Sequence, residues 1–274
     1  MLCFKNDSPK NGSEIIIIAL VFGFLITAFL YASVGFGGGS TYNALLILTE
    51  TDYQLVPKIA LCCNLIVVSG GLLRYHQNKL IPWNLALPLV VISVPFAWLG
   101  GYTSISKFWF SIVLGLSLLS VGITMLLRLS EVLKTAEWTK TKSGYFYLSM
   151  ASGGLGFLAG LVGIGGGIFF SPLLHLLKAA PSKNIAAFSS FFILVNSMSG
   201  LIGQFMKHDD IQVVGQFFEY SWLFIVVLIG GQIGSYLGIK VFQPEIVRRL
   251  TAVLVIYVGV RLVLMAIELT VNIS

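Results

Sequence analysis

Long apolar runs with short polar links between them dominate this sequence. A membrane-crossing helix needs about 20 mainly apolar residues, and eight runs approach or reach that length. They cover residues 15–33, 59–73, 81–100, 108–127, 145–162, 185–206, 217–239 and 250–269. Two further apolar pieces, 41–48 and 168–177, are about ten residues long, roughly half a bilayer at about 1.5 Å per residue. We therefore expect an all-α polytopic membrane protein.

The composition supports that class and excludes others. Hydrophobic residues make up 57% of the 274 residues and charged residues only 10%, whereas soluble domains carry about 25% charge. The same balance excludes intrinsic disorder, and three cysteines are too few for a disulfide scaffold. The basic residues behind the net charge of +6 lie singly or in short groups between apolar runs. They indicate membrane topology, and nucleic acid is not an expected partner.

An internal repeat divides the chain near its middle. Residues 34–39 read VGFGGG, and residues 162–167 read VGIGGG. In each half the cluster follows a long run and precedes a half-length piece, a short loop with Pro and Lys, and three full runs. Many secondary transporters are built from two such halves. The expected segments are a polar tail 1–14, a first repeat 15–129, a polar connector 130–143 and a second repeat 144–274.

The distribution of Lys and Arg distinguishes two arrangements, because basic residues concentrate on the cytoplasmic side. If each long run and its half-length piece cross the membrane once, the loop residues divide nine to seven. If each pair forms a hairpin that returns to the side it left, they divide eleven to five, which favours the hairpin. The smaller set is Lys5, Lys10, Lys58, Lys107 and Lys207. The larger set is Arg74, Lys79, Arg128, Lys134, Lys140, Lys142, Lys178, Lys183, Lys240, Arg248 and Arg249.

The hairpin arrangement predicts two inverted repeats, each a glycine-broken helical hairpin plus three transmembrane helices. The connector would lie in the cytoplasm and both termini outside.

The two glycine clusters are the strongest candidates for a functional site. Glycine weakens a helix by about 0.8–1 kcal/mol relative to Ala, so four glycines in six positions predict a break. Broken backbone is tolerated at membrane depth only inside protein or beside a wet cavity. The half-helices that begin at Ser40 and Ile168 would point free N–H groups into such a cavity, which suits an anion. The expected substrate contacts are Gly35, Gly37, Gly38, Gly39, Gly163, Gly165, Gly166, Gly167 and Ile168.

Close helix packing is the alternative interpretation of glycine. We expect it for the scattered pairs Gly70-Gly71, Gly100-Gly101, Gly153-Gly154 and Gly230-Gly231.

Polar side chains near the breaks are expected to line the same cavity, because hydroxyls and amides bind oxyanions without a fixed charge. In the first half these are Ser40, Thr41, Asn43, Asn64 and Ser69. In the second half they are Ser171, Ser189, Ser190, Asn196, Ser197 and Gln204. The alternative for each is a hydrogen bond between helices or back to the preceding turn.

Ionisable residues inside the runs are few. No Asp or Glu lies deep in a run, which disfavours a cation substrate and favours an anion. His175 and Arg261 do lie inside runs, and their roles stay open between backbone contacts and a part in transport. The sequence has no HExxH, GxSxG, paired intramembrane carboxylates or Cys/His cluster. We therefore expect no enzyme, no cofactor and no metal site.

The duplicated cluster resembles that of a known family. Residues 34–48 (VGFGGGSTYNALLIL) and 162–176 (VGIGGGIFFSPLLHL) resemble the signature of the sulfite exporter family of the TauE/SafE type. That signature carries a Pro shortly after the glycines, which the second half has at Pro172 and the first half replaces by Ala44. The resemblance runs from about residue 15 to residue 269. It implies a plasma-membrane transporter of sulfur-containing anions or related organic acids.

Together these observations predict a secondary transporter, an exporter of sulfite or a small organosulfur or sulfonate anion that works by alternating access. Substrate would bind between the repeats, against residues 37–40 and 165–168. The expected partners are the small anion and the lipid bilayer of the plasma or inner membrane. An anion channel and a transporter of other small organic acid anions are the alternatives. The coupling ion, the transport direction and the oligomeric state stay open.

Overall fold

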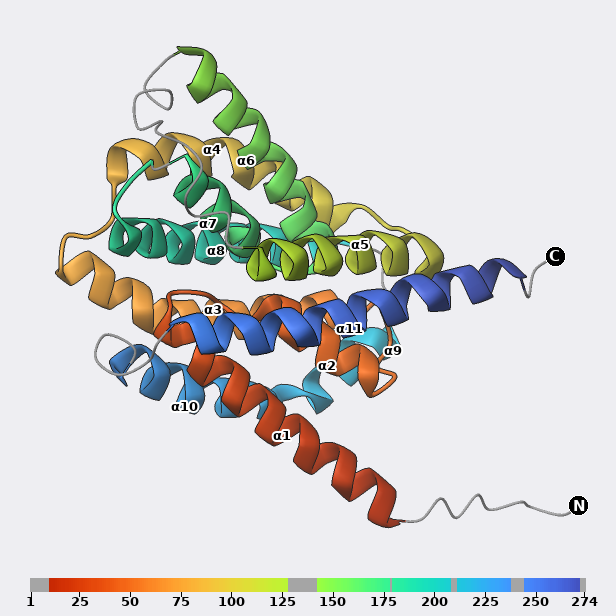
Figure 1. The fold of residues 1–274 in the computed structure, drawn as a ribbon. Coiled ribbons are helices and arrows are strands. Elements are labelled where there is room, and N and C mark those ends of the chain that lie inside the picture. Colours follow the sequence, from red (N-terminus) through yellow and green to blue (C-terminus); the bar gives the residue numbers. More distant parts are fainter. Residues whose placement is uncertain (1–9, 128–141, 178, 208–210, 238–243, 272–274) are drawn as a thin grey trace, which may run out of the picture.

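The computed structural model describes residues 10–127, 142–177, 179–207, 211–237 and 244–271. Within these ranges it contains eleven helices and no strands (Figure 1). Six helices are long and apolar enough to cross a membrane. They are α1 (Lys10–Ser33), α3 (Val56–Gln77), α4 (Trp83–Tyr102), α5 (Lys107–Leu126), α6 (Lys142–Val162) and α8 (Ser182–Phe205). The all-α polytopic membrane fold is thereby confirmed.

The remaining helices complete the expected order. The half-length pieces are α2 (Gly39–Leu48) and α7 (Gly167–Leu176), and the last two runs form α10 (Ser221–Leu237) and α11 (Pro244–Val271). One boundary was wrong, because the run expected at 217–239 is divided at Tyr220 between α9 (Ile211–Glu219) and α10. The ring of Phe217 in this short helix α9 packs on Phe205 of α8 and Phe224 of α10. Most of the polar tail and of the connector lies outside the described residues.

Positive φ angles mark both glycine breaks. Gly35 and Gly38 have φ angles of 84° and 88°, and Gly163, Gly165 and Gly166 have φ angles of 77°, 80° and 74°. Side chains with a Cβ rarely adopt this region, whereas glycine enters it freely. Gly38 is the residue that caps α2. The clusters therefore end one helix and start the next within a few residues.

Helix pairings in one half have counterparts in the other. In Figure 1, α3 and α8 lie side by side in the interior, and α5 lies along α11. The packing of α1 on α10 is matched by that of α6 on α4, and the packing of α3 on α10 by that of α8 on α4. Likewise α2 packs on α3 and α7 on α8. Exchanging the two halves thus reproduces the main contacts.

Glycines set the close approach of several helices. A methyl group built on Gly200 of α8 would lie 2.8 Å from Cα of Gly160 in α6, and one on Gly230 would lie 2.6 Å from the carbonyl oxygen of Leu25. The packing predicted for the scattered pairs is confirmed at Gly70, Gly100, Gly101, Gly153, Gly230 and Gly231. It is wrong for Gly154, where an added methyl meets nothing within 4 Å, and for Gly71, where it meets only Tyr75 at 4.0 Å. Small residues at helix crossings let backbones approach, but a methyl group added to either of these two would meet no neighbouring helix.

Three contacts show which loops share an end of the molecule. Lys58, at the start of α3, and Lys207, after α8, line one pocket. At the opposite end of these helices, Asn184 Nδ2 donates to the carbonyl oxygen of Leu80 over 2.9 Å. Arg74 Nη1 donates to Ser235 Oγ over 2.7 Å. The start of α3 therefore lies at the same end of the molecule as the end of α8. The end of α3 lies at the opposite end, beside the start of α8 and the end of α10.

Candidate functional site

The two glycine breaks meet inside the molecule. Asn43 Nδ2 of α2 donates a 2.6 Å hydrogen bond to the carbonyl oxygen of Val162, the last residue of α6. Ser190 Oγ of α8 donates a 2.6 Å bond to the carbonyl oxygen of Gly35. A methyl group built on Gly39 would lie 2.9 Å from the carbonyl oxygen of Gly163. Each break is therefore held by contacts from the other half of the chain.

Asn64 of α3 lies between the breaks. Its side chain is fully buried. A methyl group on Gly39 would lie 2.5 Å from Asn64 Nδ2, and one on Gly165 would lie 2.9 Å from the same atom. Gly37 also has Asn64 as its nearest neighbour. Because these three glycines have no side chain, the Asn64 amide has room to lie between the breaks. The need for this room explains why residues 37, 39 and 165 are all glycine.

Buried polar atoms with no hydrogen-bond partner among the described residues gather around these breaks. They are Ser40 Oγ, Tyr42 OH, Asn43 Oδ1, Asn64 Oδ1, Asn64 Nδ2, Ser189 Oγ, Asn196 Oδ1 and Ser197 Oγ. Such an atom costs about 1–3 kcal/mol when buried without a partner. A group of them in one place calls for an explanation, and a bound polar ligand is one that fits. All come from α2, α3 and α8, the elements that surround the breaks.

Other predicted contacts make hydrogen bonds within the protein. Thr41 Oγ1 pairs with Tyr31 OH at 2.9 Å. Gln204 Nε2 donates to the carbonyl oxygen of Gly160 over 2.8 Å, and Ser69 Oγ donates to the carbonyl oxygen of Ile66 over 2.8 Å. For these side chains, as for Ser190, the alternative interpretation describes what the structure shows. Ser171 and Ile168 are buried in α7 close to the second break.

The two halves contribute different side chains at matching glycines. A methyl group built on Gly37 or Gly39 would meet the amide of Asn64, and one on Gly167 would meet the apolar side chain of Ile193. One on Gly165 would lie 2.9 Å from both Asn64 Nδ2 and Ile193 Cγ2. Gly166 has its nearest contact with the ring of Phe192, at 3.0 Å from an added methyl. The geometry of the breaks is repeated, but the polar groups around them are not.

Lys58 was missed as a candidate site residue. Its side chain is 1% exposed, and it is the only charged side chain buried among the residues whose burial the structure describes. Its neighbour Pro57 touches the second break, since a methyl on Gly163 would lie 2.5 Å from Pro57 Cα. Sequence reasoning counted Lys58 as a loop charge. The sequence feature that could have predicted its burial is its position directly before an uninterrupted apolar run that leads to Asn64.

Of His175 and Arg261, the two ionisable residues predicted inside runs, only Arg261 has a described side chain. Arg261 is half-buried on α11. His175 lies in α7, but its side chain is outside the described residues. Among the described residues, no group of three or more His, Cys, Asp and Glu side chains could hold a metal ion.

Comparison with known proteins shows which proteins and which family this chain resembles. Over 249 residues the chain is 28% identical to "Probable membrane transporter protein y4hK" of Sinorhizobium fredii, covering 89% of this chain and 97% of that protein. It is 26% identical to "Probable membrane transporter protein YunE" of Bacillus subtilis, covering 90% of this chain and 97% of that protein. No solved structure matches the chain. The family model described as "Sulfite exporter TauE/SafE" matches residues 19–262.

That match spans nearly every helix and both glycine breaks. The chain therefore belongs to the sulfite exporter TauE/SafE family of membrane transporters.

Proposed function

We propose that this protein is a secondary transporter that exports a small anion, sulfite or a small organosulfur or sulfonate compound, from the cell. The observation that carries the proposal is the group of unpartnered amide and hydroxyl atoms around the two glycine breaks. The description of the family as sulfite exporters supports the sulfur-containing substrate.

The charge distribution around the breaks favours an anion. The half-helices α2 and α7 both begin at a break, and helix N-termini carry a partial positive charge with free N–H donors. Lys58 is the buried charge nearest to this region along the chain. Amide and hydroxyl groups supply further donors to oxygen atoms. A cation would meet the same groups without a carboxylate to neutralise it.

Alternating access about two inverted repeats is the proposed mechanism. The matched helix pairings support two equivalent halves. The shared pocket of Lys58 and Lys207 supports the hairpin arrangement, because a single crossing by each pair would put these lysines on opposite sides of the membrane. Substrate would bind where the halves meet, and rocking of one half against the other would expose it to each side in turn.

The orientation follows from the basic residues. The end of the molecule with Arg74 and Lys79 carries the larger predicted set of basic residues, so we place this end in the cytoplasm. We place the protein in the plasma or inner membrane. Helix α1 begins and α11 ends on the side where α9 lies (Figure 1). Both termini are therefore proposed to lie outside.

A flux screen in proteoliposomes tests this function. The anions are sulfite, thiosulfate, methanesulfonate and acetate, each measured as initial rate against concentration. We expect saturable transport with preference for a sulfur-containing anion. A preference for acetate would mean that the substrate is another small organic acid anion. A rate that rises linearly with concentration, without saturation, would favour an anion channel.

A further inference from the structure

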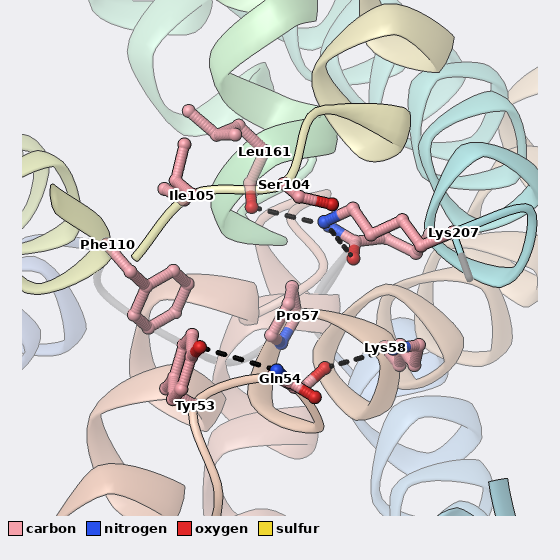
Figure 2. A pocket seen from close by; sticks show the side chains of 10 residues that line it. Tyr53, Gln54, Pro57, Lys58, Ser104, Ile105, Phe110, Leu161 and Lys207 are labelled. Atoms are coloured by element: carbon pink, nitrogen blue, oxygen red, sulfur yellow. Dashed lines mark hydrogen bonds between the residues drawn. The ribbon is translucent and has the colours of Figure 1, made fainter. Parts of the chain in front are cut away.

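A pocket with two lysines lies at the end of the molecule where α3 and α5 begin. It is walled by the ends of α4, α6 and α8 and by the segments around them (Figure 2). The lining residues are Tyr53, Gln54, Pro57, Lys58, Ser104, Ile105, Phe110, Leu161, Gln204 and Lys207. The first seven come from the first half of the chain and the last three from the second, so both halves build this pocket.

The pocket carries positive charge. Two of its described lining residues are lysines and none is acidic. Lys58 is 1% exposed, and its Nζ donates to the carbonyl oxygen of Gln54 over 3.3 Å. Asp52 is the nearest carboxylate along the chain from Lys58, but it is exposed and accepts a 2.9 Å hydrogen bond from the backbone N–H of Gln54. Solvent therefore screens the charge of Asp52.

Gln204 fixes the position of Lys207. Its side chain is 1% exposed, and its Nε2 donates to the carbonyl oxygens of Gly160 and Leu161 over 2.8 Å and 3.3 Å. The amide oxygen then accepts a 3.0 Å hydrogen bond from Lys207 Nζ. This chain of bonds ties the Lys207 ammonium to the last turn of α6 at the edge of the pocket, and Figure 2 draws those bonds that join pocket residues.

The pocket borders the second glycine break. Pro57 lines the pocket and packs against Gly163, which has a φ angle of 77°. Leu161 also lines it, and the next residue, Val162, accepts the hydrogen bond from Asn43. An ion in the pocket would therefore lie beside the wall that the break forms, at one end of the path that the proposed function requires.

We propose that this pocket binds a small free oxyanion, a sulfite, sulfonate or carboxylate group, between the ammonium groups of Lys58 and Lys207, before the anion reaches the glycine breaks. An ammonium is a compact charge that pairs well with oxyanions. Ser104 and Tyr53 supply hydroxyl donors at the rim. The place of this subsite on a transport path rests on the proposed function, while the binding itself does not.

The test measures binding without transport. Purified protein in a neutral detergent is titrated with sodium sulfite against sodium chloride at equal ionic strength, and thermal unfolding is followed. We expect sulfite to stabilise the native protein and its apparent dissociation constant to rise about tenfold in Lys207→Met, through loss of one charge-assisted hydrogen bond. Lys107→Met is the matched control, because it removes an exposed lysine next to the pocket, and it should bind as the native protein does.

Two further variants keep the result interpretable. Lys58→Met should weaken binding and Lys58→Arg should restore it, which separates loss of charge from loss of packing. In an Asn64→Leu background, which alters the glycine breaks, the effect of Lys207→Met should persist. Absence of stabilisation by sulfite, or equal binding by the native protein and both Met variants, would overturn the pocket. Stabilisation through Lys207 by phosphatidylglycerol but not by sulfite would also overturn it, in favour of a lipid headgroup.

The outcome is separable from that of the proposed function. Binding that depends on Lys207 without any anion flux in proteoliposomes would contradict the transporter proposal alone. Flux with binding that does not depend on either lysine would contradict the pocket alone.

Discussion

Asn64 is the side chain on which the account of the site depends most. It is buried, both of its polar atoms lack a partner among the described residues, and it contacts glycines of both clusters. A side chain retained for stability alone would make its hydrogen bonds within the protein, as Gln204 and Thr41 do. We therefore propose that the unpartnered amide takes part in binding.

This predicts opposite effects of Asn64→Leu on stability and transport. Removing a buried amide without partners relieves a cost of about 1–3 kcal/mol, so the variant should unfold at the same or a higher temperature. Anion flux should fall about tenfold or more, because the ligand loses a hydrogen-bonding group. Thermal unfolding and proteoliposome flux measure the two effects on one preparation. Unchanged flux, or clear destabilisation, would mean that Asn64 is a structural residue.

The sequence could identify such residues but not their partners. Ser40, Asn43, Asn64, Ser189 and Asn196 were predicted from their polarity in apolar runs, and all carry an unpartnered buried atom. Ser190 and Gln204 satisfied the same criterion, yet Ser190 bonds to the carbonyl oxygen of Gly35 in the first break and Gln204 to that of Gly160 in α6. Lys58 was missed for a related reason. Whether a lysine at a helix start is buried depends on what the second half of the chain brings against it.

At the scale of helices, the apolar runs and the glycine clusters predicted where most of the helices lie. The half-helix α2 was expected at 41–48 and lies at Gly39–Leu48, and α7 was expected at 168–177 and lies at Gly167–Leu176. Four glycines in six residues interrupt a helix whatever surrounds it. The division between α9 and α10 was not predicted, because phenylalanines that pack on other helices resemble residues that face lipid.

Helix packing supplies a second prediction. Gly200 lies where α8 meets α6, and an added methyl would lie 2.8 Å from Gly160 Cα. Gly200→Ala should therefore push these helices apart and lower the unfolding temperature by several degrees, since a cost of about 1 kcal/mol shifts the midpoint by about 2–4 °C in a chain of this size. Thermal unfolding in detergent measures this shift.

The matched control is Gly71→Ala in α3, where an added methyl meets only Tyr75 at 4.0 Å. It should be neutral or stabilising, because alanine favours a helix. Equal unfolding temperatures for the two variants would show that the α6–α8 contact does not need glycine.

At the scale of the whole molecule, two halves with matched helix pairings meet at the two glycine breaks. The side chains beside the clusters differ between the halves: the amide of Asn64 lies next to glycines of both clusters, whereas Ile193 lies next to Gly165 and Gly167. A repeat keeps the backbone geometry that the mechanism needs, while each half can carry its own side chains. Large apolar side chains such as Phe22, Val91 and Phe146 remain exposed on the outside, where lipid would cover them.

The inverted arrangement predicts sidedness. In a variant without its native cysteines, Lys107→Cys should react with a membrane-impermeant maleimide added to intact cells. Lys79→Cys should react only after permeabilisation, because it lies at the end with the larger set of basic residues. Both positions are exposed in the structure. Labelling of both from the same side would contradict the topology.

The central claim, that the glycine breaks hold the transported anion, is tested most directly by sulfite flux in proteoliposomes of Gly166→Val. Gly166 has a φ angle of 74°, and an added methyl would lie 3.0 Å from the ring of Phe192. Gly154→Val is the control, because a Cβ built on Gly154 meets nothing within 4 Å, on the same helix that leads into the break. The account predicts saturable flux in the native protein and in Gly154→Val, and none in Gly166→Val, with all three inserted and monodisperse. Native flux in Gly166→Val would contradict it.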